Sequence, residues 1–164
     1  MIRVVHGDLA REAVDAVLRP ADASLAPVGS AAERLDDLGG ERFAAQRRSA
    51  TPLEAGAAVV TGAGDLPAGY VLHVVIADER GPAGRDQVRR ALVSAWQRAG
   101  DWGLARVASP LVGTAGGRLG VEDAAGLLLE TFPRGADGGG MELVIVTDSA
   151  GERDAVEAIV RRTT

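Results

Sequence analysis

The segment with the clearest chemical potential is a glycine-rich stretch, residues 113–120, which contains four glycines. An apolar run, residues 105–112, precedes it, and an amphipathic segment with an acidic first turn follows it from Val121. A strand, a glycine loop and a helix start in this order allow backbone N–H groups to converge on a phosphate, and the helix dipole adds to the attraction. Glycine is also common in simple turns between strands and helices, so a purely geometric role is an equal alternative.

Several familiar nucleotide-binding and catalytic motifs are absent. Without any lysine, the chain cannot form a Gly-x4-Gly-Lys-Ser/Thr phosphate loop. Residues 62–67 begin like a dinucleotide fingerprint, but proline stands at the third glycine position, which indicates a turn. Gly29-Ser30 lacks the frame of a nucleophile elbow, and His6 and His73 lie within strand-like runs, where we expect structural roles. With two histidines and no cysteine, we expect neither a metal site nor a cofactor.

Composition limits the class of protein. The 164-residue chain has the length of one domain, so we expect a single domain over residues 1–164. A net charge of −5 argues against binding to a nucleic-acid backbone but leaves room for a local anion pocket. No signal-peptide pattern is present, and no apolar stretch approaches the roughly 18 residues of a membrane span, so we expect a cytoplasmic protein without membrane association. All 18 basic residues are arginine and asparagine is missing, which a GC-rich genome explains.

Strand-like and helix-like segments alternate along the chain. Two near-continuous apolar runs, 70–77 and 142–147, are typical of strands buried on both faces. Apolar residues recur at helical spacing over 88–99 and 121–132, and Gly39-Gly40 could split a further helix. This alternation predicts a three-layer α/β/α sandwich with a six-stranded mixed, largely parallel sheet. We expect strands at 2–6, 14–18, 57–61, 70–77, 105–112 and 142–147, and helices near 31–48, 88–99, 121–132 and 155–162.

Four short motifs together resemble the macrodomain family, the ADP-ribose-binding module, over essentially the whole chain. Each is weak alone, but their order and spacing put them at matching strand ends. They are Gly7-Asp8-Leu9 after the first strand, residues 14–25 across the second strand and its loop, Thr61-Gly62 with Leu66-Pro67 before the run at Tyr70, and residues 110–117 followed by Val121. The resemblance implies a macrodomain-like fold that binds ADP-ribose or a related adenine nucleotide.

The resemblance also implies roles for individual aspartates. Asp8 matches the family's aspartate that accepts a hydrogen bond from the exocyclic amine of adenine, and Leu9 is its apolar neighbour. The alternative for Asp8 is a turn or the cap of a helix that begins near Ala10. Asp22 replaces the last asparagine of the family's Asn-Ala-Ala-Asn loop. Its carboxylate can accept from ribose hydroxyls, but it lacks the N–H donor and adds negative charge near the expected diphosphate.

Two loops are expected at the diphosphate. The first, residues 26–31, keeps one of the family's consecutive glycines, and Pro27 has no N–H to donate. The second, residues 113–120, is better preserved, and Arg118 is either a counter-charge or a solvated loop residue. Asp148 is expected near adenine or its ribose, without an aromatic neighbour to stack on the base. The expected ligand-binding residues are Asp8, Leu9, Asp22, Val28, Gly29, Ser30, Gly113, Thr114, Ala115, Gly116, Gly117, Arg118, Leu119 and Asp148.

Catalysis has little support from the sequence. In the hydrolytic branch of the family, an aspartate ten residues after the asparagine orients the attacking water, and Ala32 stands at that position. Glu33 is adjacent, but the next residue of a helix points about 100° away. Asp22 and Glu33 are therefore only weak candidates for a general base, and we expect binding with weak or no catalysis. The alternatives are an ADP-ribosyl hydrolase or O-acetyl-ADP-ribose deacetylase with unusual residues, and a degenerate scaffold that no longer binds ADP-ribose. An ADP-ribosylated protein is a further candidate partner.

Overall fold

A computed structural model describes residues 1–48, 52–115, 118–134 and 140–163 of the chain. The strands are β1 (Ile2–His6), β2 (Ala16–Asp22), β3 (Ala58–Gly62), β4 (Tyr70–Asp78), β5 (Gly81–Pro82), β6 (Arg106–Ser109) and β7 (Glu142–Thr147). The helices are the 3-10 helix η1 (Leu9–Arg11), α1 (Ser30–Gln46), α2 (Arg85–Asp101), α3 (Val121–Thr131) and α4 (Ala150–Thr163). No helix within the described ranges is long and apolar enough to cross a membrane.

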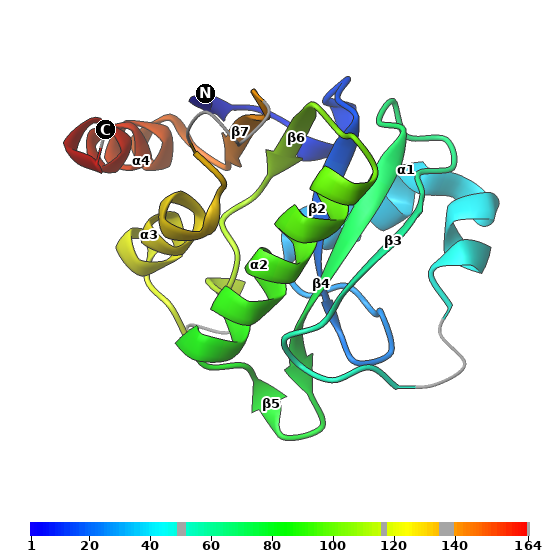
Figure 1. The fold of residues 1–164 in the computed structure, drawn as a ribbon. Helices are drawn as coiled ribbons and strands as arrows, with labels where there is room; N and C mark the ends of the chain where they lie inside the picture. Colours follow the sequence, from blue (N-terminus) through cyan, green and yellow to red (C-terminus); the bar gives the residue numbers. More distant parts are fainter. Residues whose placement is uncertain (49–51, 116–117, 135–139, 164) are drawn as a thin grey trace.

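The strands form one mixed sheet in the order β1-β7-β6-β2-β4-β3, with β5 paired to β4 (Figure 1). The first five strands in this order, β1, β7, β6, β2 and β4, pair in parallel with their neighbours. Strands β3 and β5 each pair antiparallel with β4. The predicted mixed, largely parallel α/β sheet is therefore confirmed. The additional seventh strand is the two-residue β5, which is too short to leave an apolar pattern in the sequence.

The second strand differs from its prediction because of tertiary contacts. The second strand continues beyond Leu18 through Arg19 and Pro20, since β2 keeps its pairing with β4 as far as Asp22. Proline is tolerated at position 20 because pairing of β2 with β6 ends at Val17, so no strand on that side needs the missing N–H. The Pro20 carbonyl on the same side accepts a hydrogen bond from Val28 at 3.1 Å. The predicted break in the first long helix is confirmed by Gly40, whose φ of 79° and ψ of −177° interrupt α1.

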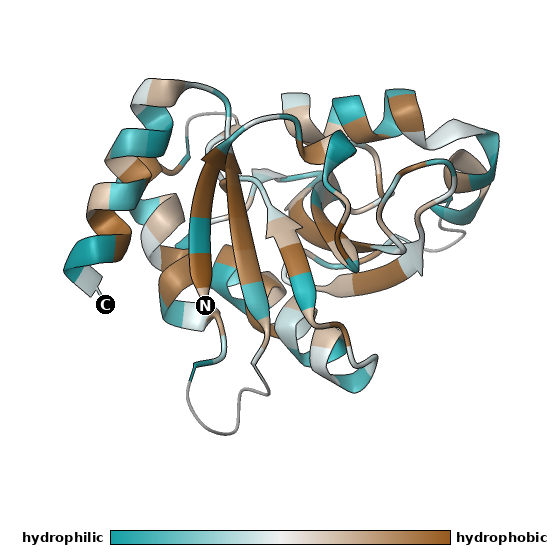
Figure 2. Ribbon diagram, turned by 90° about the horizontal axis from the view of Figure 1, so that it is seen from above, coloured by the Kyte–Doolittle hydropathy of each residue, from teal (hydrophilic) through white to brown (hydrophobic). Residues whose placement is uncertain are grey.

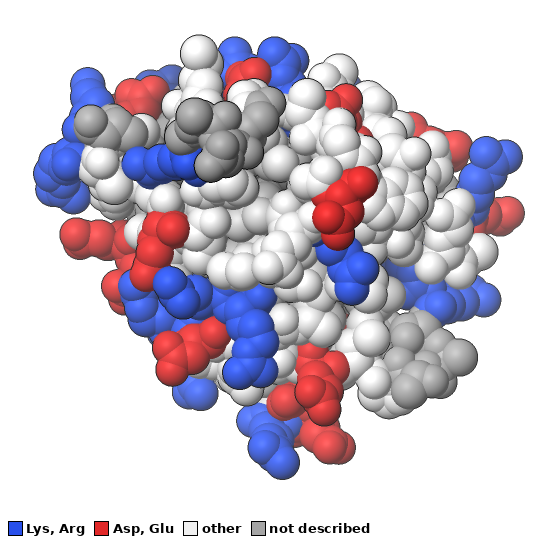
Figure 3. Space-filling model, in the orientation of Figure 1, with Lys and Arg blue, Asp and Glu red and all other residues white. Residues whose placement is uncertain are grey.

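Helices cover both faces of the sheet. Helices α2, α3 and α4 lie on one face and α1 with η1 on the other, and the strands between them are largely hydrophobic (Figures 1 and 2). Successive residues of β7 point to opposite sides, so Leu143 and Ile145 join the core under α2–α4 while Val144 joins the core under α1. On the face seen in Figure 3, acidic and basic side chains are interspersed rather than segregated.

On the face of the sheet under α1, a row of hydrogen-bonded side chains is centred on the buried Arg19. The Arg19 side chain is fully buried and donates to both carboxylate oxygens of Asp36, at 2.9 and 3.0 Å. A third nitrogen of Arg19 lies 3.1 Å from Nδ1 of His73. Because arginine can only donate, Nδ1 accepts and the ring proton is on Nε2. Nε2 then donates to Thr61 Oγ1 at 2.7 Å, and Thr61 donates to the Gly62 carbonyl at 3.0 Å.

His73 is therefore a structural residue, as expected from its place in a strand. Burial lowers the pKa of His73 from 6.5 to about 3, and the nearby cations Arg19 and Arg47 act in the same direction. The ring stacks on Phe43, with centroids 5.9 Å apart. A neutral imidazole is required here, since a protonated one would place a second cation against Arg19.

This network predicts an acid-sensitive stability. The unfolded chain protonates His73 near pH 6.5 and the folded chain near pH 3, so the histidine's contribution is complete above about 6.5 and is lost as pH falls toward 3. Between about pH 7 and pH 5, the free energy of unfolding should fall by about 2 kcal/mol more in the wild type than in His73→Gln. Glutamine can accept from Arg19 and donate to Thr61 but does not titrate. Urea unfolding over this range measures the difference, and parallel curves for the two proteins would refute the assignment.

Candidate functional site

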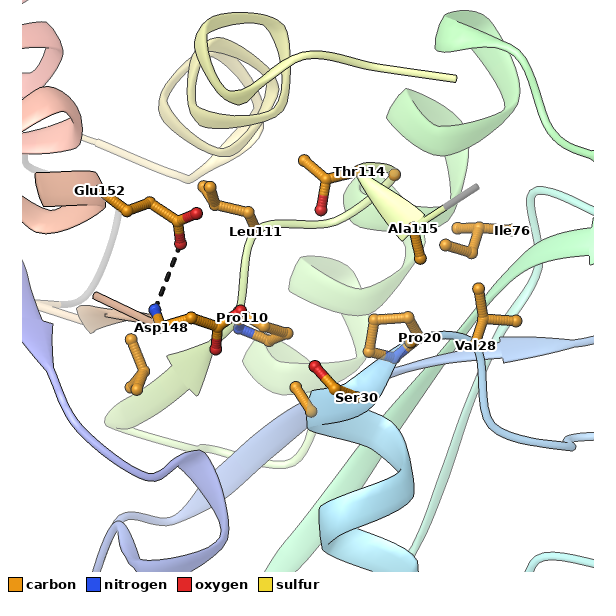
Figure 4. Close-up of a pocket in the computed structure, with 14 residues that line it drawn as sticks. Pro20, Val28, Ser30, Ile76, Pro110, Leu111, Thr114, Ala115, Asp148 and Glu152 are labelled. Carbon is orange, nitrogen blue, oxygen red and sulfur yellow. Dashed lines mark hydrogen bonds between the residues drawn. The ribbon is translucent and has the colours of Figure 1, made fainter. Parts of the chain in front are cut away.

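A cleft runs along the carboxyl ends of the parallel strands, the edge at which open α/β sheets bind ligands. Its centre is a cavity of about 240 Å³ between the N-terminus of α1 and the loop after β6, with Ser30 and Thr114 on opposite sides (Figure 4). We call this the central cavity. A cavity of about 290 Å³ adjoins it at Asp8, and one of about 280 Å³ adjoins it at Arg118. Each shares lining residues with the central cavity, so the three form one continuous cleft.

The loop after β6 is held in a closed shape by Gly113. The Gly113 carbonyl accepts a hydrogen bond from Leu119 at 3.1 Å, which joins the two ends of the loop. Gly113 has a φ of 97°, and a Cβ there would lie 2.6 Å from Leu119 Cδ1. Of the expected ligand-binding residues, Gly113, Thr114 and Ala115 line the central cavity and Arg118 lines the neighbouring one. Gly116 and Gly117, also expected in this site, lie outside the described residues.

The opposite wall is the start of α1. Gly29 precedes the helix with a φ of 95°, and no side chain in the described part of the chain caps this terminus. The first N–H groups of α1 are therefore free to meet an anion, which the helix dipole also favours. A Cβ on Gly29 would lie 3.2 Å from Ala115 Cβ, so the two loops approach closely at this point. The expected ligand-binding residues Val28, Gly29 and Ser30 all line the central cavity.

Asp22 lies outside the cleft. Its Oδ1 accepts three hydrogen bonds from its own loop: from the Ser24 N–H at 2.9 Å, the Ser24 hydroxyl at 2.8 Å and the Ala26 N–H at 3.0 Å. It lines a separate cavity of about 740 Å³ with Leu53 and Arg80. The carboxylate thus shapes the loop that leads to Gly29, and it does not add negative charge to the walls of the central cavity.

Asp8 caps a short helix, one of the two roles considered for it, and it also lines the cleft. Its Oδ1 accepts from the Ala10 N–H at 3.1 Å and so caps η1, while the residue lines the cavity at one end of the cleft. Its Oδ2 accepts from Arg34 at 3.2 Å and from Arg11 at 3.3 Å. Partial burial acts to raise the pKa of Asp8, but the hydrogen bond from Ala10, the hydrogen bond and charge of Arg34 and the hydrogen bond from Arg11 together outweigh it and lower the pKa. The carboxylate is held ionised and acts as an acceptor. Leu9 lines the same cavity.

Two further carboxylates line the central cavity at the end of β7. Asp148, predicted as a site residue, donates its backbone N–H to Glu152 Oε1 at 3.3 Å (Figure 4). Asp148 also lines the Asp8 cavity, so it lies where the two cavities meet. Both carboxylates can accept hydrogen bonds from hydroxyl groups.

Sequence reasoning missed two charged residues of the cleft, Arg34 and Glu152. Arg34 follows Ser30 by four residues on α1, so one face of the helix presents both, and this spacing was a usable signal. Glu152 gave no such signal, because its position depends on how α4 begins beside β7. The weak catalytic candidate Glu33 is exposed and lines none of the three cavities, and Ala32 is buried. Across the described ranges, no group of three or more metal-ligating side chains is assembled.

The contacts of Asp22 predict that its oxygen, and not its charge, is required. Asp22→Asn keeps an acceptor for Ser24 and Ala26, so the free energy of unfolding should stay within about 0.5 kcal/mol of the wild type. Asp22→Ala removes that acceptor and should lower it by about 1–2 kcal/mol. Urea unfolding compares the variants. Equal losses in both would mean that the loop depends on the negative charge.

The shape of the second loop depends on glycine at position 113. Gly113→Ala should lower the free energy of unfolding by about 1–3 kcal/mol, because alanine strains the positive φ and meets Leu119. Gly126→Ala is the matched control, since nothing lies within 4 Å of a Cβ there. That change is inside α3 and should be neutral or stabilising by up to about 1 kcal/mol. Thermal unfolding of the pair tests this, and equal stability of the two variants would contradict it.

The comparisons with known proteins agree with this architecture. A macro domain-containing protein of Streptomyces coelicolor is 32% identical over 142 residues, 79% of this chain and 81% of that protein. An O-acetyl-ADP-ribose deacetylase of Pantoea vagans is 31% identical over 124 residues, 69% of this chain and 70% of that protein. Mycobacterial relatives are 28% identical over 159 residues, and the chain spans 44% of the length of the one from Mycobacterium tuberculosis. Among solved structures, a Trypanosoma brucei macrodomain in complex with ADP has a TM-score of 0.85 at 21% identity, covering 97% of this chain and 68% of that one.

The sequence model of the Macro domain matches residues 18–128, more than half of the chain. This segment extends from β2 to α3, and it includes the α1 terminus and the Gly113 loop that face each other across the central cavity. By sequence and by fold, the chain belongs to the macro domain family.

Proposed function

We propose that the cleft binds ADP-ribose or a related adenine nucleotide and that the chain acts as a binding module with weak or no catalysis. The observation that supports this best is the pair of facing backbone elements at the central cavity. The uncapped start of α1 and the loop from Gly113 both present main-chain groups and small side chains to the same space, which suits a diphosphate.

The remaining cavities suit the two ends of such a ligand. Asp8 would supply a fixed acceptor for the exocyclic amine of adenine. Asp148, which lines both this cavity and the central one, and Glu152 in the central cavity would accept from ribose hydroxyls. The Arg118 cavity, at the opposite end, would hold the distal ribose. Macrodomains of the same fold from Trypanosoma brucei and Oceanobacillus iheyensis were solved with ADP, which supports this assignment.

The placement of Asp22 favours binding over a degenerate scaffold. A carboxylate beside the diphosphate would weaken binding, but the Asp22 carboxylate is turned into its own loop. Pro27 remains a lost donor in that loop, so the α1 terminus and the Gly113 loop would supply most of the contacts.

The Arg118 cavity gives little support to hydrolysis. Its described lining is mostly apolar, with Pro27, Ile76 and Ala83 among its walls, and it includes no carboxylate or imidazole. A general base is therefore missing where the distal ribose would react. Deacetylation of O-acetyl-ADP-ribose is the second candidate, because the Pantoea vagans relative is named for that activity.

A negative charge placed between the two loops should weaken binding. Isothermal titration calorimetry should give a dissociation constant for ADP-ribose on the order of micromolar for the wild type. Ala115→Glu should weaken it by at least tenfold, since it adds a carboxylate beside the expected diphosphate. The matched control, Ala155→Glu, makes the same change at an exposed position of α4 and should leave affinity within about twofold.

Two results would count against the proposal. Unchanged affinity in Ala115→Glu would remove the central cavity from the binding site, and no heat with ADP-ribose in the wild type would favour a degenerate scaffold. Release of acetate from O-acetyl-ADP-ribose, or of ADP-ribose from a modified protein, would replace the binding module by an enzyme.

A further inference from the structure

The Asp8 end of the cleft has an acceptor for a base but no aromatic surface to hold it. Among the described residues that line this cavity, none is aromatic, and Arg34 has the only extended planar group. A nucleobase held at one edge alone can pivot about its hydrogen bond. Its orientation therefore requires a flat surface against its face, which an arginine guanidinium can supply.

The hydrogen bonds of Asp8 limit what its carboxylate can offer to a base. Its Oδ2 accepts hydrogen bonds from Arg11 and Arg34, and its Oδ1 accepts one from the Ala10 N–H. A carboxylate has about four lone-pair sites, so a single position on Oδ1 remains for a ligand. One hydrogen bond fits the exocyclic amine of adenine, but it cannot fix the plane of the ring by itself.

The same contacts orient Arg34. Its Nε and Nη2 both donate to Asp8 Oδ2 at 3.2 Å, which fixes one edge of the guanidinium. The side chain remains 45% exposed, so its faces are not fully covered by protein. A planar cation held by its edge next to a base acceptor has the form of a stacking platform.

We propose that Arg34 is the base-stacking residue of the cleft. This inference rests on the proposed function. It assigns to a side chain of α1 the stacking that no aromatic residue supplies among the described residues lining the Asp8 cavity.

Three substitutions separate stacking from charge and from the ion pair with Asp8. Arg34→Ala should weaken ADP-ribose binding by about 5- to 50-fold, the usual effect of removing a stacking partner. Arg34→Lys keeps the charge and a donor for Asp8 but lacks the plane, so a similar loss is expected. Arg34→Trp has the plane without the charge and should stay within about threefold of the wild type. Calorimetry gives the affinities, and thermal unfolding shows that each variant folds.

Arg11→Ala is the matched control. Arg11 also donates to Asp8 Oδ2, at 3.3 Å, but it does not line the cavity. Its loss should change affinity by less than twofold. Wild-type affinity in Arg34→Lys, or equal losses in Arg11→Ala and Arg34→Ala, would overturn the stacking role while leaving the proposed function intact. A wild type that does not bind ADP-ribose would instead end the proposed function, and the role of Arg34 with it.

Discussion

The position of α1 against the sheet is the constraint on which the cleft depends, and the buried Arg19–Asp36 ion pair fixes it. A fully buried guanidinium must be matched by a carboxylate, because an unpaired buried charge costs about 3–5 kcal/mol. Asp36 lies on the same helix as Ser30 and Arg34, so the pair that anchors the helix also places its N-terminus and its arginine at the cleft. The neutral ring of His73, on β4, accepts a hydrogen bond from the remaining Arg19 nitrogen.

The proposed site combines a centre that would attract an anion with an acidic Asp8 end, in a chain of net charge −5, and Asp148 and Glu152 line the central cavity itself. Its attraction for phosphate would come mainly from oriented main-chain N–H groups, which are fixed by the backbone and need no side-chain ordering. Asp8, Asp148 and Glu152 would then accept hydrogen bonds from the amine and hydroxyl groups of the same ligand. The N–H groups would thus meet the phosphates, and the carboxylates would meet the hydrogen-bond donors. Selectivity in such a site depends on geometry more than on net charge.

Particular residues show how far sequence reasoning reached. The buried strands β4 and β7 were predicted to within a residue, because continuous apolar runs leave few alternatives. Of the two contacts suggested for Asp8, the cap is confirmed, since an Asp before a short helix has a local partner in Ala10, and the contact with adenine stays a prediction. The motif places Asp22 at the cleft, but its carboxylate instead accepts hydrogen bonds from the nearby N–H groups of Ser24 and Ala26. Arg34 was overlooked because its partner, Asp8, is 26 residues away.

The sequence by itself determined the alternation of strands and helices and the layered α/β class, because these follow from local periodicity. It also determined the break at Gly40 and the loop at Gly113, because both positions have φ values that only glycine adopts easily. Only the tertiary structure decided which side chains share a cavity. The order of the strands and the placement of the helices bring residues that are far apart in the chain into one cavity. Local hydrogen bonds then decide which carboxylates face that cavity. For that reason Glu152 and Arg34 lie at the cleft while Asp22 and Glu33 do not.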